Sequence, residues 1–417
     1  MILAAACSRK SCRKRVIKQA KKLRKTIWRQ RERLRNRQLS RSYTVTHLPK
    51  NIDERSNEEF KRMLRMDREN FHKLFKLLEP YLFNTNIRMA ILSSGSYISK
   101  QAKVMCCLRF LAGASYLYLL AIFGVSKSSL YSTDHRKGMI WPVIDAINAC
   151  VSLQIGLDYK NKGKMDEVAS GFSAWNNGAM HGCVSAIDGW VCPIQKPSPE
   201  DAPDGNVKNF MNRSGCWALV VLAGCDHKCR FNMFSAMNSG ATNDALAWSW
   251  CPMKEILESE DWPEDYYVIG DEAFVNTNRF LVPYAGTGLA KKQDSFNYCL
   301  SKMRQCIERA FGLMVQRWGI LWRSLRVEFS AMPKLLMAIA RLHNFCINAG
   351  DEIPSKRYNK DCIDEDMYRV TMNREVDENA DPRRALGYSR RQDLTEDVYN
   401  RGIIRPPSSL YSRAKES

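Results

Sequence analysis

Apolar residues recur at helical spacing through the first 157 residues of the chain. In residues 55–83 they stand three and four positions apart, which predicts one amphipathic helix that Pro80 ends. Two shorter apolar helices are expected over Val104–Leu111 and Leu117–Phe123, and a further helical stretch over Ile140–Leu157. The polar residues 158–180 are expected to form a connection.

From residue 181 the pattern changes to short, continuous apolar runs, which are typical of buried strands. The predicted strands are Val184–Asp188, Trp217–Gly224, Phe231–Met237 and Tyr266–Gly270. A loop over residues 192–215, a turn over Cys225–Cys229 and a short helix over Ala245–Ile256 separate them. Two helices, Phe296–Trp322 and Met332–Asn348, follow, and the tail over 351–417 shows little periodicity. This order predicts an α/β core, a mixed sheet flanked by helices, behind an all-α region.

The second apolar helix is followed by Gly124 and by a serine that can cap a polar helix over Lys127–Lys137. An apolar helix, a glycine turn and a capped polar helix together outline a helix-turn-helix. Outward residues of the polar helix are of the types that contact phosphates and base edges. The predicted DNA contacts are Lys127, Ser128, Ser129 and Arg136. A helical pair with a glycine corner and no DNA contact would show the same pattern.

The net charge of +20 is concentrated at one end of the chain. Residues 1–50 hold 17 of the 64 Lys and Arg residues but only one of the 44 acidic residues. This composition predicts a basic, mostly disordered arm that attracts polyanions and suits nuclear import. Since the remaining residues are nearly balanced in charge, we expect the arm to address the protein to the nucleus and to nucleic acid.

Other classes of protein fit the sequence less well. The 15 cysteines are odd in number, widely spread and without a CxxC pair, which argues against a secreted disulfide scaffold. Cys225-Asp226-His227-Lys228-Cys229 lacks the distant ligand pair of a structural zinc site, so a turn is favoured there. Val104–Val125 is long enough to cross a membrane, but Arg109 and Gly113 favour a buried helix pair. We therefore expect a soluble protein without a membrane partner.

Two of the predicted strands end in a carboxylate, in Ile187-Asp188-Gly189 and in Ile269-Gly270-Asp271. A carboxylate at the end of a buried strand loses hydration, and a divalent cation compensates for that loss. Glu308 lies on the flank of the helix predicted over residues 296–322. We predict that Asp188, Asp271 and Glu308 meet and hold two Mg²⁺ ions about 3.5–4 Å apart, with Mn²⁺ as the alternative ion.

Other interpretations of these carboxylates stay open at this point. Asp244 and Glu272 are rival ligands that the pattern alone does not exclude. Aspartates that only start turns, with a surface glutamate on the helix, would give the same pattern.

Seven short motifs, in a fixed order, resemble the nuclease domain of PIF/Harbinger-type transposases and their domesticated relatives, a DDE family. They are Ala186–Gly189, Asn212–Gly215, Cys225-Asp226 with Arg230-Phe231, Ser239–Asp244, Ile269–Phe274, Ile307–Gly312 with Arg317–Leu321, and Leu342–Ile347. Residues 108–113 and 123–126 are similar to the helix-turn-helix region of that family. The resemblance runs from about residue 55 to residue 348, and one departure is Asn243-Asp244, where many members have His-Asp.

The resemblance implies an RNase H-like nuclease core in which Asp188, Asp271 and Glu308 are the three metal-binding carboxylates. It implies a DNA transposase that cleaves transposon ends and transfers the freed 3′-hydroxyl to target DNA. It also implies a Myb-like accessory protein and a homodimer. A domesticated DNA-binding regulator that keeps the fold without cleaving DNA is the alternative.

Four regions follow from the pattern and the resemblance together. We expect a basic arm over residues 1–50, a helical region with the helix-turn-helix over 51–160, the nuclease domain over 181–348 and a mostly irregular tail over 349–417. Six basic residues within 301–330 would hold phosphates near the site. From these and the loop over residues 192–215 we predict DNA contacts by Arg213, Arg304 and Arg309.

Overall fold

The computed structural model describes residues 52, 55–84, 86, 88, 97–202, 205–286, 288–351 and 388–406. The predicted basic arm over residues 1–50 and most of the tail lie outside the described residues. The chain divides into two compact units, which are described separately. The first unit contains residues 82–110 and 114–143. The second contains residues 57–81, 111–113 and everything from Ile144 onward.

The first unit is helical, and the two predicted apolar helices are present in it. They are α6 (Lys100–Leu111) and α7 (Tyr116–Phe123). Ser115 caps α7 by accepting a hydrogen bond from the backbone of Tyr118, and α7 ends at Gly124 in the left-handed conformation, with φ of 61°. The predicted glycine turn is therefore present at the position that the sequence indicates.

The polar helix of the first unit, α8, is shorter than predicted and spans only Lys127–Tyr131. Ser126 caps it, as expected, by accepting from the backbone N–H of Ser129. The following residues turn instead of continuing the helix, because Asp134 accepts from the backbone of Arg136 and Lys103 donates to carbonyls in the same turn. The turn and cap of a helix-turn-helix are present, but a five-residue second helix does not confirm that motif.

The second unit starts with α3 (Asn57–Leu64) and α4 (Arg68–Leu78), where the sequence predicted a single helix. The break falls at Arg65, whose φ is 63°, a conformation that no α-helix contains. Asp67 then begins α4, and its backbone N–H donates to the carboxylate of Asp351. The predicted apolar face is retained on both helices, since Phe60 and Phe71 are fully buried and meet edge to face.

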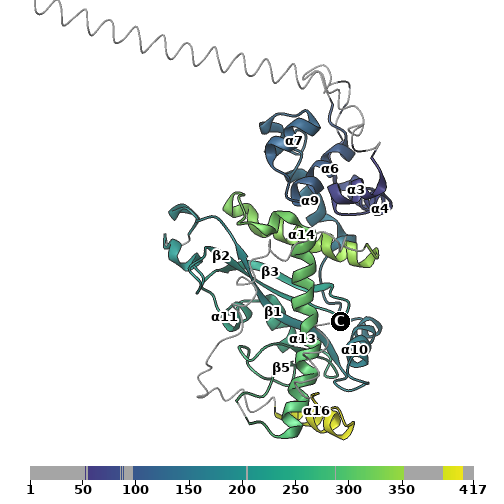
Figure 1. Ribbon diagram of the computed structural model, residues 1–417, viewed down its shortest axis with the longest axis vertical. Helices are drawn as coiled ribbons and strands as arrows, with labels where there is room; N and C mark the ends of the chain where they lie inside the picture. The colour runs from purple at the N-terminus through teal and green to yellow at the C-terminus, as the bar shows by residue number, and fades with distance from the viewer. Residues whose placement is uncertain are drawn as a thin grey trace, which may run out of the picture. The chain divides into compact units, whose positions relative to one another are not determined.

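A mixed five-stranded sheet forms the centre of the second unit (Figure 1). Its strands are β1 (Cys183–Pro193), β2 (Ala218–Cys225), β3 (Phe231–Ser239), β4 (Tyr267–Ile269) and β5 (Phe280–Leu281). The order across the sheet is β3-β2-β1-β4-β5, in which β1, β2 and β3 are antiparallel neighbours and β4 and β5 run parallel to β1. This topology is consistent with the expected RNase H-like core.

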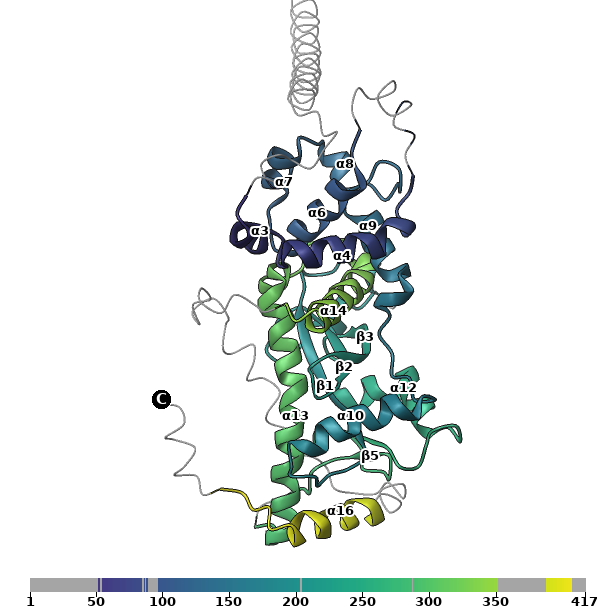
Figure 2. The same ribbon diagram turned by 90° about the vertical axis from the view of Figure 1, so that its right-hand side faces the viewer.

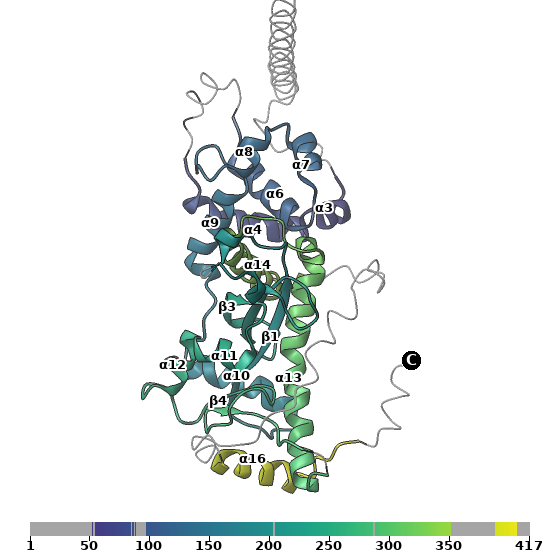
Figure 3. The same cartoon turned by 90° about the vertical axis from the view of Figure 1, so that its left-hand side faces the viewer.

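Helices cover both faces of the sheet, with α13 on one side and α12 on the other (Figures 2 and 3). The α-helices of the second unit that follow α4 are α9 (Trp141–Ala149, begun in the first unit), α10 (Lys162–Ala174), α11 (Asp244–Ser249), α12 (Pro252–Glu258), α13 (Lys291–Arg317), α14 (Met332–Asn348) and α16 (Tyr388–Asn400). Single 3₁₀ turns are Glu79–Tyr81, Val151–Leu153, Pro199–Asp201, Val207–Phe210, Gly319–Trp322 and Phe329–Ala331.

Helix α10 lies in the polar segment 158–180, where the sequence analysis predicted a connection. That prediction was wrong because the buried side of α10 is narrow: Met165, Ala169 and Phe172 face inward among lysine, glycine and serine residues. The buried positions nevertheless keep helical spacing, at i, i+4 and i+7.

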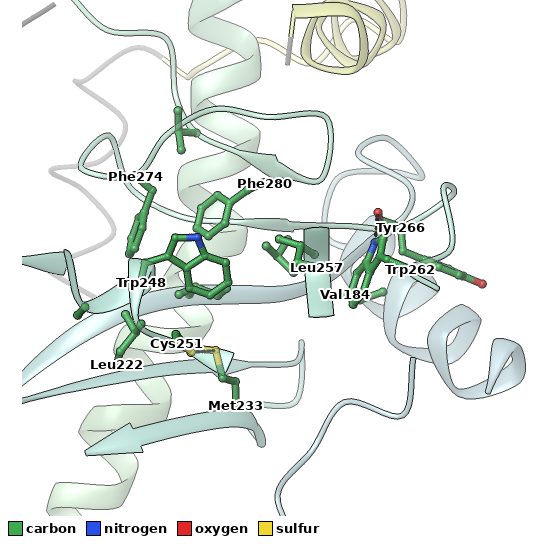
Figure 4. Close-up of a cluster of buried hydrophobic side chains, with 14 of the residues drawn as sticks. Val184, Leu222, Met233, Trp248, Cys251, Leu257, Trp262, Tyr266, Phe274 and Phe280 are labelled. Carbon is green, nitrogen blue, oxygen red and sulfur yellow. Dashed lines mark hydrogen bonds between the residues drawn. The ribbon is translucent and has the colours of Figure 1, made fainter. Parts of the chain in front are cut away.

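The hydrophobic core on the α10–α12 face gathers residues from β1, β2, β3 and the segment around β4 (Figure 4). Within it Trp248 of α11 meets Phe274 and Phe280 at ring centroid distances of 6.3 and 5.0 Å, and the two phenylalanine rings lie 4.9 Å apart. These three rings connect α11 with the loop that follows β4. On the opposite face Phe311 of α13 stacks on Trp190 of β1.

The described part of the tail contains one helix, α16, which packs against α13 (Figure 1). Leu394 and Val398 are buried at this contact, and Lys292 pairs with Glu396 at 2.7 Å. Among the residues that the structure describes, no helix has the length and apolar character needed to cross a membrane.

Candidate metal centre

Asp188 and Asp271 lie on neighbouring parallel strands at the point where β4 ends. The last paired residues of the two strands are Ala186 and Ile269, so Asp188 and Asp271 stand two residues beyond this pair on each chain. Strand β1 itself continues to Pro193 because β2 pairs with it throughout. The predicted end of the strand at Asp188 was therefore wrong. The early end of β4, and not of β1, opens the edge of the sheet beside Asp188.

A third carboxylate, that of Asp244, joins these two at the start of α11. One ligand oxygen from each of Asp188, Asp244 and Asp271 lies within 4.8 Å of the others, and no other group of this kind occurs among the described residues. From the sequence, Asp244 was only an alternative ligand, because the order of apolar and polar residues does not indicate that α11 lies beside β1. Glu272, the other rival, is exposed and outside this group.

Gly189 explains how Asp244 comes so close to β1. A Cβ atom on Gly189 would lie 2.2 Å from Oδ1 of Asp244, nearer than real atoms approach. The carboxylate of Asp244 therefore takes the space that a side chain at position 189 would fill. Gly270, on the neighbouring segment, is similarly enclosed by Phe274 and Phe280. The two glycines next to the aspartates allow the close packing that brings the three carboxylates together.

Glu308, the third member of the predicted triad, lies on α13 and reaches the group only through Arg304. The guanidinium of Arg304 donates to Glu308 at 2.8 Å and to Asp188 at 3.3 Å. The side chain of Arg304 is only 17% exposed, whereas that of Glu308 is 44% exposed. Arg304 thus forms a salt bridge to both acids, one turn before Glu308 on the flank of α13.

Burial and the closeness of the three carboxylates shift the pKa values of Asp188 and Arg304. Desolvation, together with the neighbouring charges of Asp271 and Asp244, raises the pKa of Asp188 to about 7, although the positive charge of Arg304 opposes the rise. Burial alone lowers the pKa of Arg304, but the surrounding carboxylates outweigh burial and raise it above its ordinary value.

The donor set fits a divalent ion such as Mg²⁺. Hard cations of this kind prefer carboxylate oxygens, and one or two such groups with retained waters are typical for Mg²⁺. Backbone N–H groups orient two of the carboxylates: Gly189 donates to Oδ1 of Asp188 at 2.8 Å, and Ala273 donates to Oδ1 of Asp271 at 3.0 Å. The space beside Gly189 admits the carboxylate of Asp244, and three carboxylates so close together fit the binding of a divalent cation.

The predicted DNA contacts are distributed over both units. In the first unit Lys127 and Ser128 are exposed and Ser129 is partly exposed, while Lys127 and Arg136 lie over the rings of Tyr116 and Phe83. In the second unit Arg213 and Arg309 are exposed, in the loop before β2 and on α13. Arg304 alone among the predicted contacts lies at the carboxylates.

The Cys225–Cys229 turn is a hairpin connection held by side chains. Asp226 accepts from the backbone of Lys228 and Arg230 and forms a salt bridge to Arg230 at 2.6 Å. Within the described part of the chain, Asp188, Asp244 and Asp271 are the one group of side chains close enough together to hold a metal ion. The predicted turn over Cys225–Cys229 is therefore present.

Two residues of α14 support the same hairpin, and the sequence analysis assigned them no role. The buried ring of His343 contacts the carbonyl of Cys229 at 2.8 Å, and burial lowers its pKa to about 4. The Asn344 amide accepts from the N–H of Phe231 and donates to its carbonyl, each at 2.7 Å. The motif Leu342–Ile347 contains this pair, but only the fold shows that the pair anchors β3.

Comparison with known proteins points to one family. Residues 187–344 match the family model described as DDE superfamily endonuclease. No curated protein and no solved structure matches the chain. The matched segment starts one residue before Asp188, ends at Asn344, and includes Asp188, Asp244, Asp271 and Glu308. By this match, and by a sheet and an acidic group that fit it, residues 187–344 are similar to the nuclease domain of the DDE superfamily endonucleases.

Proposed function

We propose that the protein is a metal-dependent DNA transposase of the PIF/Harbinger type, which cuts DNA at transposon ends and joins the freed 3′-hydroxyl to target DNA. The observation that carries this proposal is the meeting of three aspartate carboxylates within 4.8 Å inside a segment similar to DDE endonucleases. Asp188, Asp271 and Glu308 are the proposed triad, and Mg²⁺ or Mn²⁺ is the proposed ion.

The residues of the site have distinct proposed roles. Asp188 is fixed on the central strand and oriented by its own following N–H, so it gives the site a rigid ligand. Asp271 is held by the turn that follows β4. A bound pair of divalent ions would supply an activated water or 3′-hydroxyl and stabilise the leaving oxygen. The protein would position the phosphodiester, and a bound divalent ion would favour the deprotonated form of the carboxylates.

Basic side chains would hold the DNA. Arg309 is exposed next to Glu308, and Arg213 is exposed in the loop that precedes β2. Arg304 lies beside the carboxylates, bound to Asp188 and Glu308, and is the proposed contact to the phosphodiester nearest the metal site. In the first unit the exposed Lys127 and Ser128 at the start of α8 support the helix-turn-helix proposal.

The proposed location and partners of the protein rest on its sequence. The basic arm supports a nuclear location and salt-dependent attraction to DNA. The family resemblance suggests a Myb-like accessory protein and a homodimer.

The test is cleavage of DNA that carries the inverted repeats flanking the coding region, with Mg²⁺ and the accessory protein supplied. We expect the wild type to cut, Asp188→Asn to lose cleavage by orders of magnitude, and Glu272→Gln to cut normally, because Glu272 is exposed and outside the acidic group. Binding without cleavage by the wild type would refute the transposase and favour the regulator.

A further inference from the structure

Asp244 is the first residue of α11 and is not a member of the triad expected from the sequence. Asn243 caps this helix by accepting from the backbone N–H of Leu246 at 2.8 Å. The residue before Asp244 therefore has a capping role, which an asparagine fills well. This accounts for Asn243 where many relatives of the resembled family have histidine. The carboxylate of Asp244 is left to face β1.

Two independent features bring Asp244 to the other aspartates. Gly189 has no side chain where Oδ1 of Asp244 lies, so β1 is shaped to admit this carboxylate. Trp248, one turn further along α11, packs against Phe274 and Phe280 and so fixes α11 to the loop that carries Asp271. Asp244 is thus held next to Asp188 and Asp271 by packing on both sides.

Charge repulsion makes this arrangement costly without a cation. Three carboxylates within 4.8 Å repel one another, and desolvation of Asp188 increases that cost. Arg304 supplies a single positive charge, and it contacts Asp188 together with Glu308. A fold that brings three acids together against their repulsion is explained most simply by a multivalent cation bound among them.

We propose that Asp244 is a metal ligand, and that Asp188, Asp244 and Asp271 form the inner carboxylate set of the site. Glu308, exposed and bound to Arg304, is then the outer carboxylate. The inference rests on the proposed function for the presence of a divalent metal, but it assigns a ligand that neither the predicted triad nor the family match provides.

The experiment measures Mn²⁺ binding to the full-length protein without DNA, by isothermal titration calorimetry. We expect Asp244→Asn to weaken Mn²⁺ binding about ten- to a hundredfold, as Asp188→Asn does. Glu272→Gln is the matched control, since it removes one negative charge beside Asp271 outside the acidic group, and it should change affinity by less than about threefold. In EDTA, circular dichroism should show that Asp244→Asn is folded, so that its lower affinity for Mn²⁺ reflects the lost carboxylate.

Gly189→Ala provides a second variant that leaves every carboxylate in place. The added Cβ forces the end of the Asp244 side chain to rotate away, so affinity for Mn²⁺ should fall as in Asp244→Asn while the fold persists. If the wild type binds Mn²⁺ and Asp244→Asn binds it like Glu272→Gln, this inference is overturned and the proposed function stands. If the wild type binds no Mn²⁺, the proposed metal-dependent function itself fails.

Discussion

Replacing Arg304 by methionine tests how the site is held together when no metal is bound. Methionine keeps most of the aliphatic length of arginine but removes its charge. In the wild type the guanidinium lies 3.3 Å from Asp188 and 2.8 Å from Glu308. The substitution therefore leaves the buried Asp188 beside two other carboxylates without its nearest positive charge.

The contact with Asp188 dominates the expected effect on stability. At an effective dielectric constant of about 20, unit charges 3.3 Å apart attract by roughly 5 kcal/mol, and desolvation of the two groups offsets part of this. The contact with the half-exposed Glu308 adds less than about 1 kcal/mol because solvent screens it. We expect Arg304→Met to lower the free energy of unfolding in EDTA by about 3 kcal/mol.

A bound divalent ion should remove most of this loss, because it neutralises the same carboxylates. In saturating Mg²⁺ the difference between Arg304→Met and the wild type should shrink to about 1 kcal/mol or less. Urea unfolding followed by circular dichroism, with EDTA and with Mg²⁺, measures both values. Arg309→Met, on the exposed side of the same helix, should change stability by less than about 0.5 kcal/mol in either buffer. Equal losses for Arg304→Met in both buffers would show that a bound ion does not replace the charge of Arg304.

Three further predictions concern the rest of the second unit. Asp351→Ala should lower the free energy of unfolding, measured in urea, by about 3–5 kcal/mol. The substitution removes the ion-pair partner of Arg317, whose side chain is only 4% exposed. The free energy of unfolding should fall as the pH drops from about 6.5 to about 4, because His343 becomes protonated in the unfolded chain but not in the folded protein. The loss due to His343 approaches roughly 3 kcal/mol. His343→Gln should make the free energy of unfolding less dependent on pH in this range. Val398→Asp should release α16 from α13, because it places a charge at a fully buried position. Hydrogen exchange should then become faster in α16 while the exchange rates in β1 stay the same.

The sheet was predictable in large part because its strands are buried runs with clear breaks. Trp217–Gly224 and Phe231–Met237 were predicted within two residues of β2 and β3 at each end. The extent of β1 was missed because Asp188 and Gly189 interrupt the apolar run before Trp190, whereas pairing with β2 continues the strand to Pro193. The pattern of apolar residues along the chain indicates which residues are buried. The length of a strand depends on the strands that pair with it.

The candidate site was predicted in the parts that sequence position determines. Asp188 and Asp271 follow from strands that run into carboxylates, and their closeness follows from parallel neighbours. The nearness of Asp244 did not follow, because it depends on how α11 packs through Trp248 onto Phe274 and Phe280. The ion pair between Arg304 and Asp188 joins residues 116 positions apart, and spacing along the chain cannot reveal it.

The three inner carboxylates are attached to parts of the fold that should open at very different rates. Asp188 lies on the central strand, where only global unfolding exposes the backbone. Asp244 lies on a six-residue helix in which Leu246 is exposed, as is Trp250 at its C-cap, and such short elements exchange early. Any ion that joins the two would connect this short helix to the central strand of the sheet. Metal loading should therefore appear first as slowed hydrogen exchange in α11, before any change in the sheet.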